Sequence, residues 1–174
     1  MSIDVKPTHT TLRWSDFTVT SNRPVDPADN TAQDSVTAFE YALENKGPRK
    51  VGNEFAFPDP WKFTVSPRAV VWSGAAQTAA LLDHEQFHYD VGIVCARAMA
   101  RSLSRVRVRK ESELMGVLLS HERLHLHRRA GLLQRHYDRE TNHSRNAVAQ
   151  SRWKRNMAAC LANPSLLMLG GWWL

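Results

Sequence analysis

One stretch of the chain has the residue types and the spacing of a catalytic metal site. His84, Glu85 and His88 form the pattern His-Glu-x-x-His. On a helix, two histidines four residues apart leave the same face, so both imidazoles can bind one ion. Glu85 lies beside that face, where its carboxylate can take a proton from a metal-bound water. This arrangement is typical of zinc peptidases, and it predicts His84 and His88 as ligands of Zn²⁺ and Glu85 as the general base.

The pattern occurs a second time, at His121, Glu122 and His125. In this copy Arg123 lies between the two histidines, and further arginines follow. A guanidinium held next to a divalent cation costs Coulomb energy and is hard to bury there. We therefore interpret the second copy as a solvated, basic helix face. It is the main competitor within the chain for the role of metal site.

A catalytic zinc usually has three protein ligands, so a third must come from elsewhere in the chain. His136, Asp138 and His143 lie together in one polar segment. His143 and Asp138 would be about 140° apart on one helix, so both can bind the same ion only if a helix starts between them. Tyr137 or His136 could stabilise a developing oxyanion, and the alternative for Tyr137 is a partly buried aromatic. Asp90 could hold a ligand imidazole or lie exposed on the surface.

The composition is that of a globular domain, with 43% hydrophobic and 23% charged residues in 174. We expect a single domain spanning residues 1–174. No run approaches the roughly 18 to 20 apolar residues of a membrane span, so we expect no transmembrane segment. The first residues lack the pattern of a signal peptide, which favours a cytoplasmic location for the chain as given. Cys95 and Cys160 do not make a disulfide scaffold.

The net charge of +6 is unevenly distributed. Residues 1–95 carry 8 Lys or Arg and 12 Asp or Glu, whereas residues 96–155 carry 15 and 5. Such asymmetry is compatible with nucleic acid or an acidic protein as partner. No nucleic-acid-binding motif accompanies it, and we interpret the arginines as solvated faces. A non-catalytic basic helical module, with structural zinc or none, is the alternative to an enzyme.

The order of patterns predicts an α+β fold, with a small antiparallel or mixed sheet followed by three helices. Within residues 1–74, alternating apolar residues predict strands at 11–19, 35–44, 51–57 and 61–72. Pro67 should mark a break, a bulge or an edge position in the last of these.

Residues 75–163 have helical patterns. We expect helices from about Ala76 to Leu103, from Glu111 to about Arg135 with an interruption at Gly131, and from between Asp138 and Thr141 to just before Pro164. Residues 164–174 form an apolar tail. This tail either packs on the domain or contacts a partner or a membrane surface.

Four segments together carry a resemblance to a known family: Trp14–Phe17, Leu81–Asp90, Tyr137-Asp138-x-Glu140-Thr141-x-His143 and Gln150-x-x-Trp153. They resemble a bacterial family of predicted secreted zinc-dependent proteases, known as domain of unknown function 922. The resemblance covers most of residues 11–162. It implies a zincin-like fold, zinc bound by His84 and His88 with His143 as the third ligand, and Glu85 as the base. Phe87 and Ser144 replace glycines of the family's pattern.

The expected function is therefore that of a zinc metallopeptidase, which hydrolyses peptide or protein substrates by means of a zinc-activated water.

Overall fold

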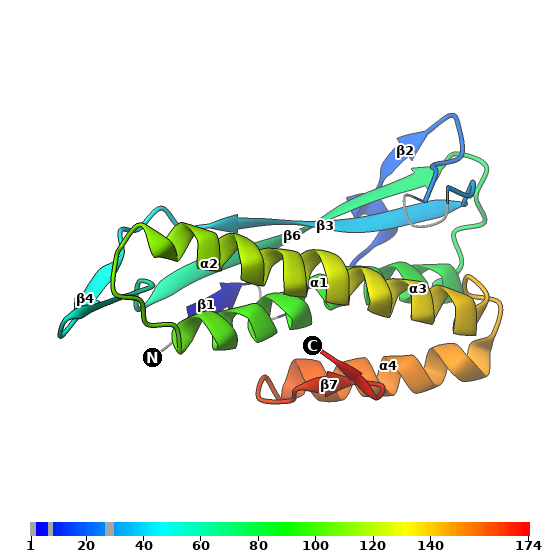
Figure 1. Ribbon diagram of the computed structural model, residues 1–174. Coiled ribbons are helices and arrows are strands. Elements are labelled where there is room, and N and C mark those ends of the chain that lie inside the picture. Colours follow the sequence, from blue (N-terminus) through cyan, green and yellow to red (C-terminus); the bar gives the residue numbers. More distant parts are fainter. Residues whose placement is uncertain (1–2, 7–8, 27–29) are drawn as a thin grey trace.

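The computed structural model of the protein describes residues 3–6, 9–26 and 30–174 (Figure 1). Strands occupy most of the first part of the described chain and helices the second part, so the predicted α+β class is confirmed. The boundary falls between β6, which ends at Trp72, and α1, which begins at Ala79. Among the described residues, no helix combines the length and the apolar character needed to cross a membrane.

The sheet is built around β6 (Trp61–Trp72), as Figure 1 shows. β3 (Ser35–Leu43) pairs antiparallel with β6 along most of its length. On the opposite edge, β1 (Ile3–Lys6) and β2 (Thr18–Thr20) pair in parallel with the two ends of β6. The sheet is therefore mixed.

Pro67 lies in the middle of β6, opposite Phe39 of β3. β1 pairs with residues 61–64 and β2 with residues 70–72, so the edge of β6 between them has no strand partner among the described residues. A proline lacks the N–H needed for a ladder hydrogen bond and is tolerated at such an edge. Of the three expectations for Pro67, the edge position is the one found.

Two predicted strands differ from the structure. Residues 11–19 form a 3₁₀ turn, Trp14–Asp16, followed by the short β2. The segment predicted as one strand at 51–57 belongs to a hairpin of β4 (Arg49–Val51) and β5 (Glu54–Ala56). The hairpin reverses at Gly52, whose φ of +61° is accessible to glycine at little cost.

The helical part starts with α1 (Ala79–Ser104), close to its predicted bounds. The next helix is continuous from Glu113 to Thr141, and its three parts are α2 (Glu113–Glu122), a π-helical segment (Arg123–Arg129) and α3 (Ala130–Thr141). α4 (Ala147–Ala162) follows, and a small hairpin of β7 (Met168–Leu169) and β8 (Trp172–Trp173) comes last.

The prediction that a helix begins between Asp138 and Thr141 is wrong. These residues instead form the last turn of α3. α3 ends at Thr141, because Asn142 takes a left-handed conformation with φ of +48°. α4 starts five residues later, where the side chain of Asn146 accepts a hydrogen bond from the Ala149 amide. The interruption expected at Gly131 is also displaced, since the irregular π-helical segment ends just before it.

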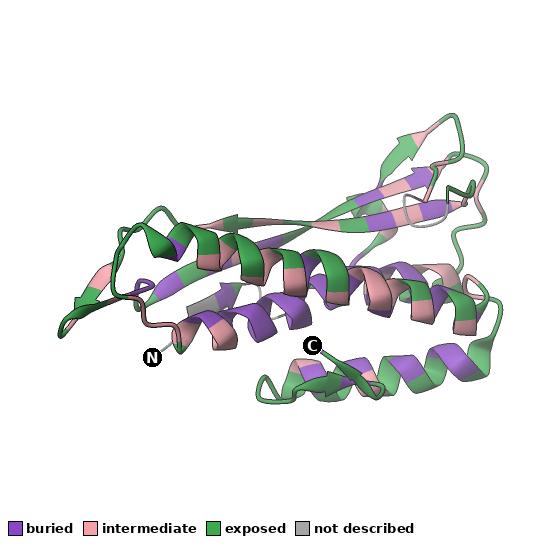
Figure 2. Ribbon diagram, in the orientation of Figure 1, coloured by how far each residue is buried: buried purple, intermediate pink, exposed green. Residues whose placement is uncertain are grey.

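α1 is the centre of the core. Residues 91–100 are all buried, because the sheet covers one side of the helix and the other helices cover the rest (Figure 2). Apart from Arg97, this segment is apolar on every side, and such a helix belongs in the core. Cys95 lies within this segment, and both it and Cys160 are buried free thiols.

Gly92 allows β3 to approach α1 closely. A Cβ atom at Gly92 would lie 2.4 Å from Cγ of Phe39. We expect Gly92→Ala to lower the free energy of unfolding by about 1 to 3 kcal/mol, because the Phe39 ring and its strand must move. Gly116→Ala is the matched control, since nothing lies within 4 Å of its Cβ position.

The control should instead raise the free energy of unfolding by about 0.5 to 1 kcal/mol through helix propensity. Urea denaturation of both variants measures the difference. Equal effects in the two variants would contradict the close packing of α1 on β3.

Candidate metal centre

The start of α1 positions the first His-Glu-x-x-His motif. The side chain of Thr78 caps the helix by accepting a hydrogen bond from the Leu81 amide. His84, Glu85 and His88 follow within the next three turns, and all three are buried. They line a cleft of about 310 Å³, whose other walls are the first half of β3 and the C-terminal end of α3.

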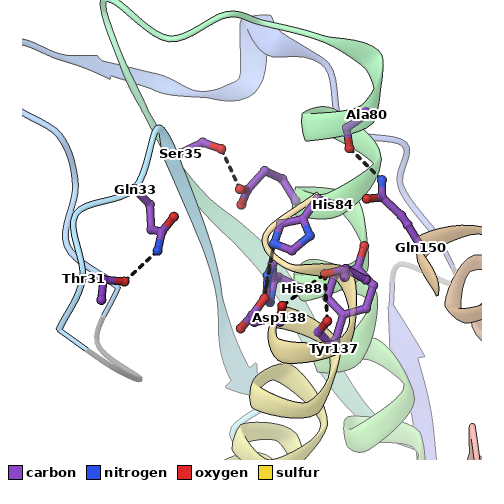
Figure 3. A network of polar contacts seen from close by, with 11 residues as sticks. Thr31, Gln33, Ser35, Ala80, His84, His88, Tyr137, Asp138 and Gln150 are labelled. Atoms are coloured by element: carbon purple, nitrogen blue, oxygen red, sulfur yellow. Dashed lines mark hydrogen bonds and ion pairs between the residues drawn. The ribbon is translucent and has the colours of Figure 1, made fainter. Parts of the chain in front are cut away.

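Asp138 approaches the two histidines from α3, and Figure 3 shows the three side chains pointing toward one another. Nε2 of His84 and Nε2 of His88 are 3.1 Å apart. Oδ1 of Asp138 lies 3.2 Å from the first of these nitrogens and 3.0 Å from the second. Three ligand atoms of a tetrahedral ion with bonds of 2.0 to 2.1 Å would be about 3.3 to 3.4 Å apart. The observed triangle is close to that geometry.

Hydrogen bonding accounts for only one side of this triangle, where one Nε2 atom can donate to the other. Oδ1 of Asp138 is buried and lies within ion-pair distance of both imidazoles, but it accepts no hydrogen bond of acceptable geometry. A buried polar atom without a partner is costly, and a cation bound between the three donors would remove that cost. The residues present therefore fit a divalent metal ion. Two imidazoles and one carboxylate are a donor set that suits zinc.

His143 reaches the same place by a sharp reversal of the chain after α3. Asn142, His143 and Ser144 have φ angles of +48°, +48° and +71°, all in the left-handed region. Donor atoms of His84, Asp138 and His143 lie within 4.8 Å of one another. From the sequence, Asp138 and His143 could bind the same ion only if a helix started between them, because on one helix they would point about 140° apart. A helix that ends between them has the same effect.

Glu85 is held by a residue far away in the sequence. Its Oε1 accepts a 2.6 Å hydrogen bond from the hydroxyl of Ser35, at the start of β3. Its Oε2 is buried and has no hydrogen-bond partner in the described part of the chain. One oxygen is thus fixed and the other is free to take a proton. No spacing or motif in the sequence connects Ser35 with Glu85, so the role of Ser35 is visible only in the fold.

Neither Tyr137 nor His136, the two predicted oxyanion donors, lines the cleft. Tyr137 is buried, its ring stacks on Phe87 at 3.7 Å between centroids, and it is not among the residues that line the cleft. It also stacks on His84, so it supports that imidazole from behind. His136 stacks on Trp172, outside the cleft.

Asp90 does not hold a ligand imidazole. Its carboxylate instead accepts a 2.9 Å hydrogen bond from Gln86 and lies 3.4 Å from Nδ1 of His9. It therefore connects α1 with the segment that precedes the 3₁₀ turn.

Other polar residues of the predicted motifs fix α3 and α4 around the site. Glu140 accepts a 2.7 Å hydrogen bond from the indole of Trp153. Gln150 donates a 2.7 Å hydrogen bond to the Ala80 carbonyl at the start of α1 (Figure 3). The hydroxyl of Thr141 donates to the carbonyl of Tyr137 within the last turn of α3. These contacts hold the end of α3 and the start of α1, which carry the donors, against the start of α4.

The second His-Glu-x-x-His copy has a different environment. His125 is buried, so the interpretation of this segment as a solvated face is wrong at that residue. Its imidazole contacts the hydroxyl of Ser102 and the guanidinium of Arg129. Burial and the charge of Arg129 lower the pKa of His125 to about 4. Glu122 is occupied by a hydrogen bond from the Tyr41 hydroxyl.

The charges of the donor cluster are strongly coupled. Burial alone would raise the pKa of Asp138, but the two imidazoles outweigh it and hold this pKa well below its usual range. Burial lowers the pKa of His84. For His88 burial acts in the same direction, yet the carboxylates of Asp138 and Glu85 prevail and raise its pKa to about 8. Without an ion, the two carboxylates therefore favour the charged form of His88.

Comparisons of the chain with protein families, with curated proteins and with solved structures find no match, so the chemistry of the site is inferred from its own geometry.

Zinc binding is expected to release about one proton per chain near pH 7, because His88 is charged below its pKa of about 8 and must be neutral to bind the ion. The apparent affinity should rise about tenfold per pH unit up to about pH 8 and level off above it. Calorimetric titration in buffers of different protonation enthalpy counts the protons. An affinity that does not change with pH would contradict the assignment.

The contribution of each donor can be separated by substitution. We expect Asp138→Ala to weaken zinc binding by more than about a hundredfold, and His143→Ala by about tenfold, because Asp138 completes the close triangle and His143 lies farther out. His136→Ala is the control, since this histidine lies outside the cleft. Competition with a chelator of known affinity measures all three. Equal losses for Asp138→Ala and His136→Ala would exclude the Asp138 assignment.

Proposed function

We propose that the protein is a zinc-dependent peptidase. The observation that carries this proposal is the triangle of Nε2 of His84, Nε2 of His88 and Oδ1 of Asp138, with sides of 3.0 to 3.2 Å, in an open cleft beside a buried carboxylate. His84, His88 and Asp138 would hold the ion. Zinc bound there would polarise a water molecule and a peptide carbonyl. The resemblance described above implies the same activity.

Glu85 is the proton carrier in this proposal. Its free Oε2 accepts a proton from the attacking water and later passes it to the leaving amine. Ser35 acts as a positioning residue, because its hydroxyl holds the other carboxylate oxygen in place. The left-handed turn brings His143 to the cleft, where its imidazole can donate a hydrogen bond to the substrate carbonyl oxygen as negative charge develops.

The substrate-binding wall would be the first half of β3. Residues 34–38 line the cleft, and β3 pairs with β6 on one edge only among the described strands. The main chain of an extended peptide can hydrogen-bond to such an edge as an added strand. A peptide or protein substrate is therefore favoured over a compact small molecule.

Glu85→Gln tests the proposed chemistry. It should abolish peptide hydrolysis, with a loss of about a thousandfold, and retain zinc, because the amide keeps the shape of the side chain but cannot accept the proton. Ser35→Ala should reduce hydrolysis by about tenfold through poorer positioning of the carboxylate, also with zinc retained. Cleavage of an unstructured protein such as casein, followed by mass spectrometry, measures activity, and elemental analysis measures zinc.

Cleavage by Glu85→Gln at the native rate would reject the peptidase. Salt-sensitive binding of nucleic acid by a native protein that cleaves nothing would favour the basic binding module instead.

A further inference from the structure

The C-terminal hairpin is fixed to the domain by one of its faces. Leu169 and Leu174 are buried. The turn at Gly170 lies so close to Trp153 that a Cβ atom would be 2.8 Å from the ring. The thiol of Cys160 donates a hydrogen bond to the Met168 carbonyl. The expectation that the tail packs on the domain is therefore confirmed for this face.

The other face of the tail is apolar and exposed. Trp173 has 59% and Leu167 52% of its surface exposed, and Leu166 and Met168, the cross-strand partner of Trp173, are also partly exposed. We call these four residues the tail patch. The solvent face of a hairpin is normally polar, and contiguous exposed apolar side chains indicate a contact with a partner or a membrane.

The charges around the tail patch are positive. Arg101 donates hydrogen bonds to the carbonyls of Pro164 and Leu166, and Arg129 donates to the carbonyl of Leu174. Glu140, which borders the turn of the hairpin, is paired with Arg152. A partner that approaches this face therefore meets apolar side chains beside the guanidinium groups of Arg101 and Arg129.

We propose that the tail patch docks on a membrane surface that contains anionic lipids. Tryptophan is favoured at the level of the lipid headgroups, because its ring is apolar and its N–H can still be hydrogen-bonded there. Basic residues next to the inserted side chains attract anionic headgroups. Since the hairpin is already packed on α4, docking orders little additional chain and costs little conformational entropy. This inference does not depend on the metal centre.

The test is co-sedimentation of the full chain with lipid vesicles. The native protein should bind vesicles of equal parts phosphatidylglycerol and phosphatidylcholine and should bind pure phosphatidylcholine much less, and added salt should weaken the binding. The double variant Trp173→Ser, Leu167→Ser should lose about tenfold or more in affinity for the anionic vesicles. Val148→Ser is the matched control, because Val148 is 81% exposed on α4 but lies outside the patch.

A second measurement does not require a variant. Brominated lipids should quench part of the tryptophan emission of the native protein, because Trp173 is exposed in the patch whereas Trp61 and Trp153 are buried. Three results would overturn the proposal: no binding to anionic vesicles, equal binding by the double variant and the native chain, or loss of self-association in the double variant while lipid binding is unchanged. The last result would assign the patch to contacts between copies of the chain.

Discussion

The approach of one carboxylate to two imidazoles is the contact on which the site depends. Asp138 lies near the end of α3, and His84 and His88 lie at the start of α1, so their contact joins two helices that are far apart in the sequence. In the absence of an ion, the cluster is held by a charged His88 beside a carboxylate whose pKa is strongly lowered. This electrostatic attraction holds the two Nε2 atoms and Oδ1 of Asp138 at 3.0 to 3.2 Å from one another, which is close to the separation of three ligand atoms around a zinc ion.

The left-handed turn after α3 has an energetic cost. A residue other than glycine in this region costs about 1 to 3 kcal/mol, and Asn142, His143 and Ser144 follow one another there. Local hydrogen bonds offset part of this cost. The amide of Asn146 donates to the Thr141 carbonyl at 2.7 Å, and its side chain donates to the Glu140 carbonyl at 3.2 Å. Such strain is concentrated at functional sites, which agrees with the place of His143 on the cleft.

The sequence could predict whatever depends on local spacing. The two histidines of α1, the glutamate between them and the bounds of that helix follow from periodicity and a motif. β3 follows from alternation. By contrast, Ser35 meets Glu85 only because β3 packs across α1, which no local pattern encodes. Whether Asp138, His143 or both can reach the ion depends on where a helix ends. A helix end set by left-handed residues other than glycine has a weak signal in the sequence. For Tyr137 the sequence left open an oxyanion donor or a buried aromatic, and the structure shows the buried aromatic.

The π-helical segment between α2 and α3 affects the register of everything that follows it. A π-helical turn contains an additional residue compared with an α-helical turn, and such turns are frequent near functional sites. If all the residues of Arg123–Arg129 were kept and became α-helical, the end of α3 would rotate by on the order of 100° relative to α2, because an α-helical residue turns farther about the axis than a π-helical one. Asp138 would then no longer face the two imidazoles. The wider turn thus sets the rotational phase of α3, and a substitution in this segment that restored α-helical hydrogen bonding would be enough to remove Asp138 from the donor set.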